Sequence, residues 1–228
     1  KEHFIKSINL NANYEKSFFN LGSLEYDLKN FLEAKSYFQK ALEINSNFQL
    51  ARYGLMKCLS YLCLWDQYQQ NIKYLDDLGI KDTPLPPLGF LSMQDDPHKE
   101  LKRAVKWNEN FRKQIKDKKK VLRVHNQKIK IGFFSSDFRE HPVMFLLLNF
   151  FKLINRDVFE VFAYSNSPFP SDSYTDSVKY SVDYFIDLFK FNNEEAIRIL
   201  ENNNLDFAID LNGHTQFNRF ELFKFQVA

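Results

Sequence analysis

The pattern of apolar and polar residues changes near the middle of the chain. Up to about residue 116, apolar residues recur at intervals of three and four positions, which predicts amphipathic helices. From residue 127 onward, short apolar runs with partial alternation are separated by helical stretches of about 10 to 15 residues. This order is typical of parallel strands joined by right-handed helical crossovers. The predicted fold class is therefore α + α/β, with helices first and a parallel sheet afterwards.

The helical part contains an internal repeat. When the sequence is shifted by 34 residues, Phe4 aligns with Phe38, and Tyr14 aligns with Phe48. A period of 34 residues is that of the tetratricopeptide repeat, a helix-turn-helix unit. Within the segment 14–47, large and small residues at the spacing of this repeat are Phe18, Leu21, Gly22, Ala34, Phe38 and Ala41. The small residues let two helices approach closely, and the large ones fill the groove between repeats.

A third helical stretch runs from Phe48 to a predicted stop at Gly79. It keeps the amphipathic spacing but loses the small-residue pattern of the repeat, as a capping element at the end of a repeat array does. We assign residues 1–80 to repeats and capping helices, whose apolar residues are expected to form a packed core. A longer array of such repeats would also present a concave surface to partner proteins.

Residues 81–126 are expected to form a Pro-containing joint and a linker helix. The segment Thr83–Gly89 contains three prolines and is expected to be extended. A helix is predicted for residues 98–116, and the basic cluster Lys116–Lys120 follows it. Because no aromatic platform accompanies this cluster, we interpret it as a solvated helix end rather than a nucleic-acid patch.

Residues 127–228 alternate between predicted strands and helices. The strands are predicted at 129–134, 159–164, 184–188 and 205–211. The helices are predicted at 143–154, 174–180, 194–202 and 217–225. Four strands with intervening helices predict βαβ units in one parallel sheet.

Two strand-to-helix turns are unusually polar. The first, Ser135–Pro142, follows the first strand and contains Asp137 and His141. The second, Asn212–Thr215, follows the fourth strand and contains His214. If these strands are parallel, both turns lie on the same edge of the sheet, where open α/β sheets bind ligands. His141 and His214 could then line one cleft.

Each residue of the first turn also has a purely structural interpretation. His141 precedes Pro142 at a helix start, so it could be a capping or buried, hydrogen-bonded histidine. Asp137 could simply cap the turn. The second turn is similarly open, because Asn212 and Gly213 form a common turn pair in which Gly213 supplies a positive φ.

The last predicted helix offers the same alternatives. Thr215 could be an ordinary helix cap. Arg219, one turn into that helix, could be a solvated cation. Neither residue identifies a chemistry by itself, and motifs such as GxGxxG, the P-loop, HExxH and GxSxG are absent from the sequence.

The composition narrows the class of function. A net charge of +2 over 228 residues provides no general field that would favour nucleic acid or an anionic membrane. Cys58 and Cys63 are five positions apart in a helical pattern and do not share a face. Since the sequence also contains no apolar run of membrane-spanning length and no signal-peptide pattern, we expect a reduced, cytoplasmic protein.

Taken in order, these segments resemble one known family. The repeats lead into CLWDQY, and then come KIKIGFFSSDFREHP, FEVFAYSNSP and DLNGHT, with Arg219 and Glu221 beyond. The chain resembles the protein O-linked N-acetylglucosamine transferases, which are family 41 glycosyltransferases, and most of all their bacterial members. The S-D-F-x-x-H-P and D-L-x-G-H-T motifs, in this order and after such repeats, carry the resemblance.

The resemblance implies an inverting enzyme of class EC 2.4.1.- with two Rossmann-like halves of the GT-B type. Such an enzyme transfers N-acetylglucosamine from UDP-GlcNAc to Ser and Thr hydroxyls of proteins, without a metal or other cofactor, and its repeats recruit the protein acceptor. His141 corresponds to the active-site histidine of the H-P motif and is expected to be catalytic. The expected cleft-lining residues are Asp137, Asn212, Gly213, His214, Thr215 and Arg219.

The sequence also departs from the family pattern. The second Rossmann-like half, which in the family holds most nucleotide contacts, does not follow within these 228 residues. Tyr184 stands where some members carry a histidine. We therefore expect a fragment of a longer protein, with little activity of its own. The alternative is a non-catalytic, protein-binding scaffold with a degenerate α/β half.

Overall fold

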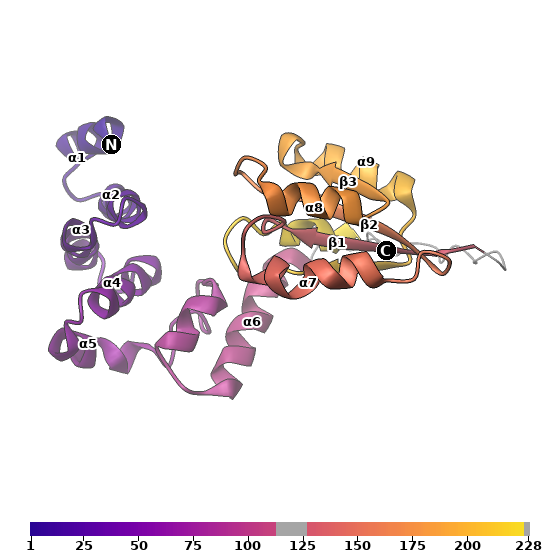
Figure 1. The fold of residues 1–228 in the computed structure, drawn as a ribbon. Coiled ribbons are helices and arrows are strands. Elements are labelled where there is room, and N and C mark those ends of the chain that lie inside the picture. Colours follow the sequence, from indigo (N-terminus) through magenta and orange to yellow (C-terminus); the bar gives the residue numbers. More distant parts are fainter. Residues whose placement is uncertain (113–126, 226–228) are drawn as a thin grey trace. The chain divides into compact units, whose positions relative to one another are not determined.

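The computed structural model describes residues 1–112 and 127–225 of the chain. The chain divides into two compact units, Lys1–Asn110 and Phe111–Ala228, and each is considered by itself (Figure 1). The basic cluster Lys116–Lys120 lies outside the described residues, as do the last positions of the helix predicted at 98–116.

The first unit is a succession of helices. They are α1 (Glu2–Leu10), α2 (Glu15–Asp27), α3 (Phe31–Ile44), α4 (Gln49–Tyr61), α5 (Trp65–Asn71) and α6 (Pro97–Arg112). Short 3-10 helices at Ile72–Tyr74 and Pro87–Ser92 stand between α5 and α6. The predicted helix-turn-helix repeat corresponds to α2 and α3.

Small residues determine how closely α2, α3 and α4 pack. A Cβ atom on Gly22 would lie 2.7 Å from the ring of Phe38, and one on Gly54 would lie 2.5 Å from it. Both distances are shorter than any ordinary carbon–carbon contact, so the ring of Phe38 fills space that only glycine leaves open on both neighbouring helices. The interpretation that small residues let the helices approach is confirmed.

The Pro-containing segment packs into the same core. Leu85 and Phe90 are completely buried, and they share a cluster with residues of α3 and α4. The expectation of an extended joint is wrong from Pro87 onward, because Pro87–Ser92 forms a 3-10 helix with proline at its first position.

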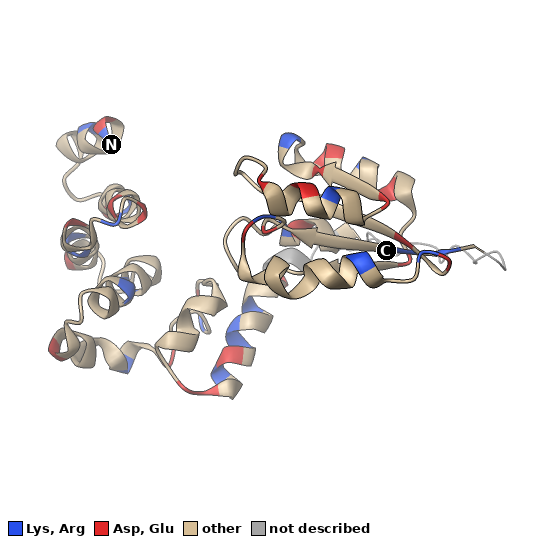
Figure 2. Ribbon diagram, viewed as in Figure 1, with Lys and Arg blue, Asp and Glu red and all other residues tan. Residues whose placement is uncertain are grey.

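A buried cation holds α6 to the first unit. Arg103 has no exposed surface, and its guanidinium donates to the carbonyl oxygens of Leu75 at 2.6 Å and Leu78 at 3.0 Å. It also donates to Oε1 of Gln94 at 2.8 Å and pairs with Glu100 at 2.6 Å. Figure 2 shows several other charged residues along α6, and nothing in the sequence pattern marks Arg103 as the buried one.

The second unit is a parallel sheet with helices on both faces. The strands are β1 (Ile129–Ser135), β2 (Phe159–Ser165), β3 (Tyr184–Asp187) and β4 (Phe207–Asp210). They pair in the order β3-β2-β1-β4, and every pair is parallel. The helices are α7 (Pro142–Leu153), α8 (Ser173–Ser181) and α9 (Asn193–Asn203), with 3-10 helices at Leu188–Lys190 and Phe220–Phe225. The predicted α/β fold with a parallel sheet is confirmed.

Alternation along β1 and β2 produces a separate core on each face. The core on the α7 and α8 side contains Phe133, Val161, Ala163, Met144, Phe151 and Val178. The core on the α9 side contains Phe134, Phe162, Tyr164, Ala196, Leu200 and Leu222. Because successive strand residues point to opposite faces, both faces of these central strands are covered, as in other parallel sheets.

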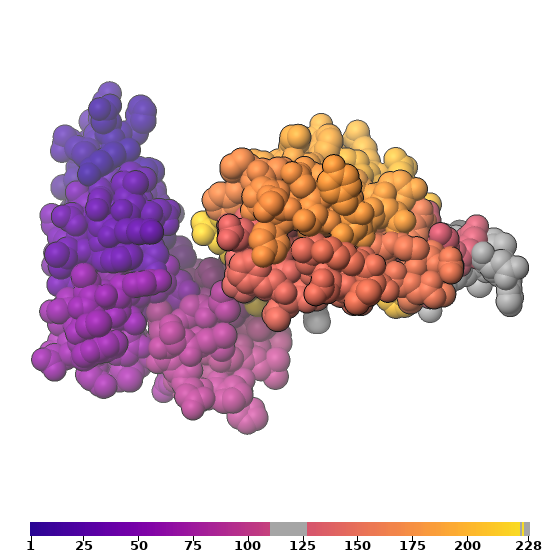
Figure 3. All heavy atoms as spheres, viewed as in Figure 1, coloured from indigo at the N-terminus to yellow at the C-terminus, as the bar shows by residue number. Residues whose placement is uncertain are grey.

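Helix α7 is apolar on its outer side as well. Figure 3 shows α7 and α8 on the surface of the second unit, and Leu146 and Leu153 of α7 are exposed. Even so, no helix among residues 1–112 and 127–225 combines the length and the hydrophobicity that crossing a membrane requires.

The last predicted helix, 217–225, is wrong in its first three positions. Only Phe220–Phe225 is helical, as a 3-10 helix, and Phe217 has a positive φ of 61°. A bulky residue in this conformation cannot continue a right-handed helix. Thr215 therefore lies in a turn rather than at a helix cap, and Arg219 precedes the helix rather than standing inside it.

Candidate active site

The strand order places the two polar turns next to each other. β1 and β4 are neighbouring parallel strands, and Phe134 pairs with Asp210 near their carboxyl ends. The chain adds β2 and β3 on one side of β1 and then returns to add β4 on the other. Ligands of open α/β sheets bind at such a reversal, outside the carboxyl ends of the strands. The prediction that both turns lie on one edge of the sheet is confirmed.

Asn212 joins the two turns directly. Its Oδ1 accepts from the backbone N–H of Ser136 at 2.7 Å, and its Nδ2 donates to Oγ of Ser136 at 2.8 Å. The same Nδ2 lies 3.3 Å from Oδ2 of Asp137 and 3.0 Å from Oγ1 of Thr215. Asn212 and Ser136 are buried, so these bonds are shielded from water. Asn212 is thus more than a turn residue, because it fixes the spacing of the two turns.

Asp210 and Gly213 shape the second turn. The Asp210 carboxylate accepts from the backbone N–H groups of Asn212 at 2.9 Å and Gly213 at 3.1 Å. Burial raises the pKa of Asp210 above its usual value, although these two donors and the nearby His214 act in the opposite direction. Gly213 has a φ of 55°, which confirms the interpretation that it supplies a positive φ.

His141 caps α7. Its Nδ1 accepts from the N–H of Val143 at 3.3 Å, and Pro142 occupies the first helical position. A ring nitrogen that accepts a hydrogen bond carries no proton, so the neutral ring holds its proton on Nε2. Oδ2 of Asp137 is 3.9 Å from the same Nδ1, a contact that becomes an ion pair only if Nδ1 is protonated.

The capping interpretation of His141 is therefore confirmed, but it does not use the whole side chain. The side chain is 32% exposed. Since Nδ1 is engaged with the helix, Nε2 is the nitrogen available to a ligand, and in the neutral ring it is a donor.

Asp137 does more than cap its turn. Its backbone N–H donates to Oγ of Ser135 at 2.9 Å, and its side chain is only 13% exposed. One carboxylate oxygen faces Asn212, and the other lies 3.6 Å from Nε of Arg139. Asp137 therefore links the β1 turn to Asn212 and to a cation at the same time.

The structure places the remaining predicted residues differently. His214 packs against Phe220 with ring centroids 5.8 Å apart, and no described contact joins it to His141. Arg219 is not merely solvated, since it donates to the carbonyl oxygen of Leu188 at 2.7 Å and to Oδ1 of Asn193 at 2.6 Å. Burial lowers the pKa of Arg219, with Glu221 opposing this effect. Within residues 1–112 and 127–225, no group of three or more His, Cys, Asp and Glu side chains could hold a metal ion.

Two residues at this edge escaped the sequence interpretation. Asp172 caps α8 through the N–H of Thr175 at 2.8 Å, and its second oxygen accepts from the N–H of Glu140, next to His141, at 2.7 Å. Asn166 follows β2 and is 3% exposed. The available signals were an Asp two positions before a predicted helix and a polar residue two positions after a predicted strand, both of which are common for structural reasons alone.

The fold and the junction of the two turns define a Rossmann-like α/β unit preceded by helical repeats. Both parts of the chain match known protein families. Residues 105–228 match the family described as glycosyl transferase family 41, and residues 15–48 match the tetratricopeptide repeat. The chain therefore belongs to glycosyl transferase family 41.

Individual relatives point the same way. One is the probable UDP-N-acetylglucosamine–peptide N-acetylglucosaminyltransferase SEC of Arabidopsis thaliana, 29% identical over 45% of this chain and 10% of the relative. Another is a UDP-N-acetylglucosamine–peptide N-acetylglucosaminyltransferase of Caenorhabditis elegans, 28% identical over 46% of this chain and 9% of the relative. The aligned part of the chain thus spans about a tenth of the length of these relatives.

A solved structure shares the fold over nearly the whole chain. A mutant of the O-GlcNAc transferase of Thermobaculum terrenum matches with a TM-score of 0.68 and 19% sequence identity. The match covers 99% of this chain and 44% of the solved chain. It supports the fold of both units.

Proposed function

We propose that this chain supplies the acceptor-recruiting repeats and one wall of the active site of a glycosyltransferase. The reaction would move N-acetylglucosamine from UDP-GlcNAc to Ser and Thr hydroxyls of proteins. The observation that carries the proposal is the junction of the His141 turn and the Asn212 turn at the reversal of strand order, in a chain of family 41. The names of the Arabidopsis and Caenorhabditis relatives support the choice of donor and acceptor.

In an inverting transfer the acceptor oxygen attacks the anomeric carbon and gives its proton to water or to the departing UDP. UDP leaves with the electrons of the carbon–oxygen bond that breaks. This step needs positioning and charge stabilisation, and it needs no nucleophile from the enzyme. With Nδ1 held by Val143, the Nε2–H of His141 is suited to donate to a substrate oxygen and orient it. His141 would accept a proton only if this cap were released.

The rest of the proposal follows the same evidence. The repeats would recruit protein acceptors, because stacked helix pairs present extended surfaces for this purpose. Neither a metal nor another cofactor is part of the proposed chemistry. The two thiols, Cys58 and Cys63, are free, which fits a reducing compartment such as the cytoplasm.

The role of His141 is tested with two substitutions in the full-length protein. His141→Asn keeps an acceptor at the N-cap of α7, whereas His141→Ala removes it. We expect both variants to lose sugar transfer by roughly 100-fold, as when one positioned hydrogen-bond donor is removed from an active site. Only His141→Ala should lose stability, by about 1 kcal/mol. Radiolabelled UDP-GlcNAc with an acceptor protein and urea denaturation provide the two measurements.

Two outcomes would contradict the proposal. A His141→Asn variant with normal transfer would reduce His141 to a helix cap. Calorimetry that detects no binding of UDP to the full-length protein would favour the non-catalytic scaffold instead. The sugar-transfer assay also tests the expectation that residues 1–228 alone transfer little sugar. Measurable transfer by this segment would refute that expectation.

A further inference from the structure

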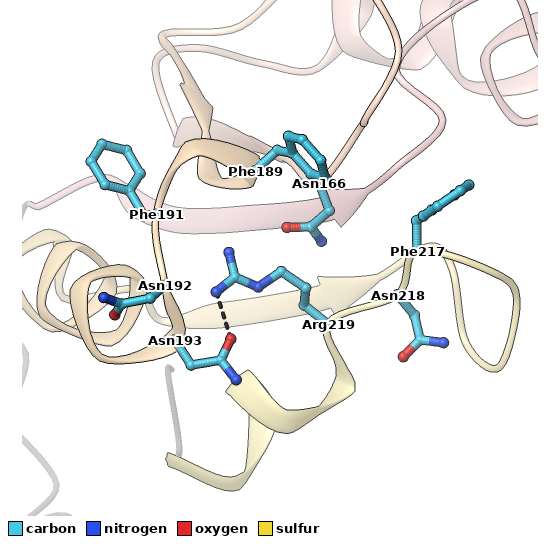
Figure 4. Close-up of a pocket in the computed structure, with 8 residues that line it drawn as sticks. All are labelled: Asn166, Phe189, Phe191, Asn192, Asn193, Phe217, Asn218 and Arg219. Atoms are coloured by element: carbon cyan, nitrogen blue, oxygen red, sulfur yellow. Dashed lines mark hydrogen bonds between the residues drawn. The ribbon is translucent and has the colours of Figure 1, made fainter. Parts of the chain in front are cut away.

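A pocket of about 330 Å³ lies at the carboxyl edge of the sheet. Its walls come from the end of β2, from the segment between β3 and α9, and from the segment between β4 and the final 3-10 helix. The side chains that matter for its chemistry are Asn166, Phe189, Asn193, Phe217 and Arg219 (Figure 4). Three segments far apart in the sequence therefore build one concave site within the second unit.

Asn166 presents unused hydrogen-bonding capacity to this pocket. Its backbone N–H donates to the carbonyl oxygen of Ser135, but Oδ1 is buried and has no hydrogen-bond partner among the described residues. An unsatisfied buried amide destabilises a protein by about 1–3 kcal/mol, so such groups are rare unless a ligand or water completes them. Figure 4 shows the amide of Asn166 directed toward the same space as the Arg219 guanidinium.

Arg219 contributes a positive charge whose position is fixed by hydrogen bonds. Its contacts with Leu188 and Asn193 orient the guanidinium, and a guanidinium has further N–H donors beyond the two used there. No carboxylate lines the pocket among the residues that the structure describes. The free donors of Arg219 and the free Oδ1 acceptor of Asn166 are therefore complementary to a ligand that both accepts and donates hydrogen bonds.

Aromatic rings form the apolar part of the pocket. Phe189 and Phe217 are 55% and 40% exposed, although they are large apolar side chains. Phe217 also holds a positive φ and meets Phe169 edge-on, with ring centroids 5.6 Å apart. Strained residues of this kind concentrate at ligand sites, because the surrounding structure must hold them in place. Exposed aromatic faces beside a few polar groups are typical of small-molecule pockets.

We propose that this pocket binds a pyranose ring. The C–H groups of the ring would lie against Phe189 or Phe217, and its polar substituents would pair with Asn166 and Arg219. A pyranose combines apolar faces with an edge of donors and acceptors, which is the combination that the pocket offers. The proposal rests on the proposed function, and the ring has two sources in that reaction: the donor nucleotide sugar, or a sugar already attached to the acceptor protein.

Ligand-observed NMR tests this on the full-length protein, with the methyl β-glycosides of N-acetylglucosamine and glucose as probes. We expect at least one probe to bind without UDP. Asn166→Leu and Phe217→Ala should weaken its binding at least tenfold. Phe145→Ala removes an aromatic ring of α7 that is 55% exposed, as Phe189 is, and that lies outside the pocket, so it should leave binding unchanged. Thermal unfolding separates misfolding from lost binding. Asn166→Leu should not destabilise the fold, because it removes a buried oxygen that has no hydrogen-bond partner among the described residues.

Competition distinguishes the two sources of the ring. If the pocket takes the donor sugar, UDP-GlcNAc will displace the bound glycoside. If it takes a sugar on the acceptor, the glycoside and UDP-GlcNAc will bind together. Either result supports the proposal that the pocket binds a pyranose ring.

Three results would overturn the proposal. They are the absence of binding by both glycosides, binding that neither pocket substitution changes, and pocket-dependent binding of a Ser-containing peptide alone. Glycoside binding without any sugar transfer by the full-length protein would contradict only the proposed function. Normal transfer with no glycoside bound would contradict only the pocket.

Discussion

At the scale of single residues, Asn212 shows how a commonplace turn residue becomes central to a site. From the sequence it is one half of an Asn-Gly turn. In the structure it fills the hydrogen-bonding needs of Ser136 on the neighbouring turn, with both atoms of its amide. The difference arises because the partner is 76 positions away, and only the pairing of β4 with β1 brings the two together.

Asn212→Ala is expected to destabilise the second unit by about 1–3 kcal/mol, because it leaves the buried N–H and hydroxyl of Ser136 unpaired. Asn212→Asp is the matched control. It keeps an acceptor for the Ser136 N–H but places a carboxylate beside Asp137. The stability that this variant loses relative to the native protein should therefore become smaller when the pH is lowered. Urea denaturation at neutral and acidic pH measures both effects. An unchanged unfolding free energy in Asn212→Ala would contradict the bridging role.

At the scale of elements, the helices of the second unit begin at side-chain caps that the sequence partly predicts. Asn192 opens α9 within a capping box with Glu195. Asp172 opens α8 in the same way with Thr175 and also holds the backbone of Glu140. The cap of α8 therefore helps to position the turn that carries His141.

Asp172 makes this arrangement sensitive to acid. Burial opposes ionisation, but the N–H donors of Glu140 and Thr175 outweigh it and hold the pKa of Asp172 below its usual value. Because folding lowers this pKa, the carboxylate stabilises the fold above the ordinary pKa of about 4. That stabilisation is lost as the pH falls through the lower value of the folded protein.

We expect Asp172→Ala to destabilise the second unit by about 1–2 kcal/mol at neutral pH, since it removes the cap of α8. Asp172→Asn gives α8 an asparagine cap, as α9 has in Asn192, so this variant should lose less stability than Asp172→Ala. The stability gap between the native protein and Asp172→Asn should close as the pH falls below about 4. Urea denaturation from pH 7 to pH 3 provides the comparison, and a gap that is constant over this range would rule out the carboxylate as its cause.

At the scale of the whole molecule, the chain consists of two units with separate cores. Helix α6 spans the boundary between the two units. From the sequence, this helix is a linker. In the structure, Arg103 anchors it to backbone carbonyls of the first unit, about 25 positions earlier in the chain.

Arg103→Met is expected to destabilise the first unit by roughly 3 kcal/mol, because it leaves several buried acceptors and Glu100 without their partner. Arg103→Lys keeps the charge but lacks the planar set of donors, so it should recover little of this loss. Hydrogen exchange measured by mass spectrometry should show reduced protection in residues 1–110 and unchanged protection in 127–225. Equal loss in both units would mean that they unfold as one.

The sequence by itself determined the class of fold, the repeat and the existence of two polar turns. These features depend on local periodicity, on glycine and proline chemistry and on the alternation of strands, all of which are contained in neighbouring residues. Gly22 and Phe38 illustrate this, because their spacing alone indicated the close approach that the structure shows. The family resemblance was equally visible in the order of short motifs, and the family match confirms it.

Only the tertiary structure decided which polar residues meet. The strand order makes β1 and β4 neighbours, which joins Asn212 to Ser136 and leaves His214 against Phe220 instead of His141. Tertiary contacts also bury Arg103 and leave Oδ1 of Asn166, at the pocket, without a hydrogen-bond partner among the described residues. These outcomes depend on contacts between distant segments, and a pattern read along one chain does not contain the distances that set them.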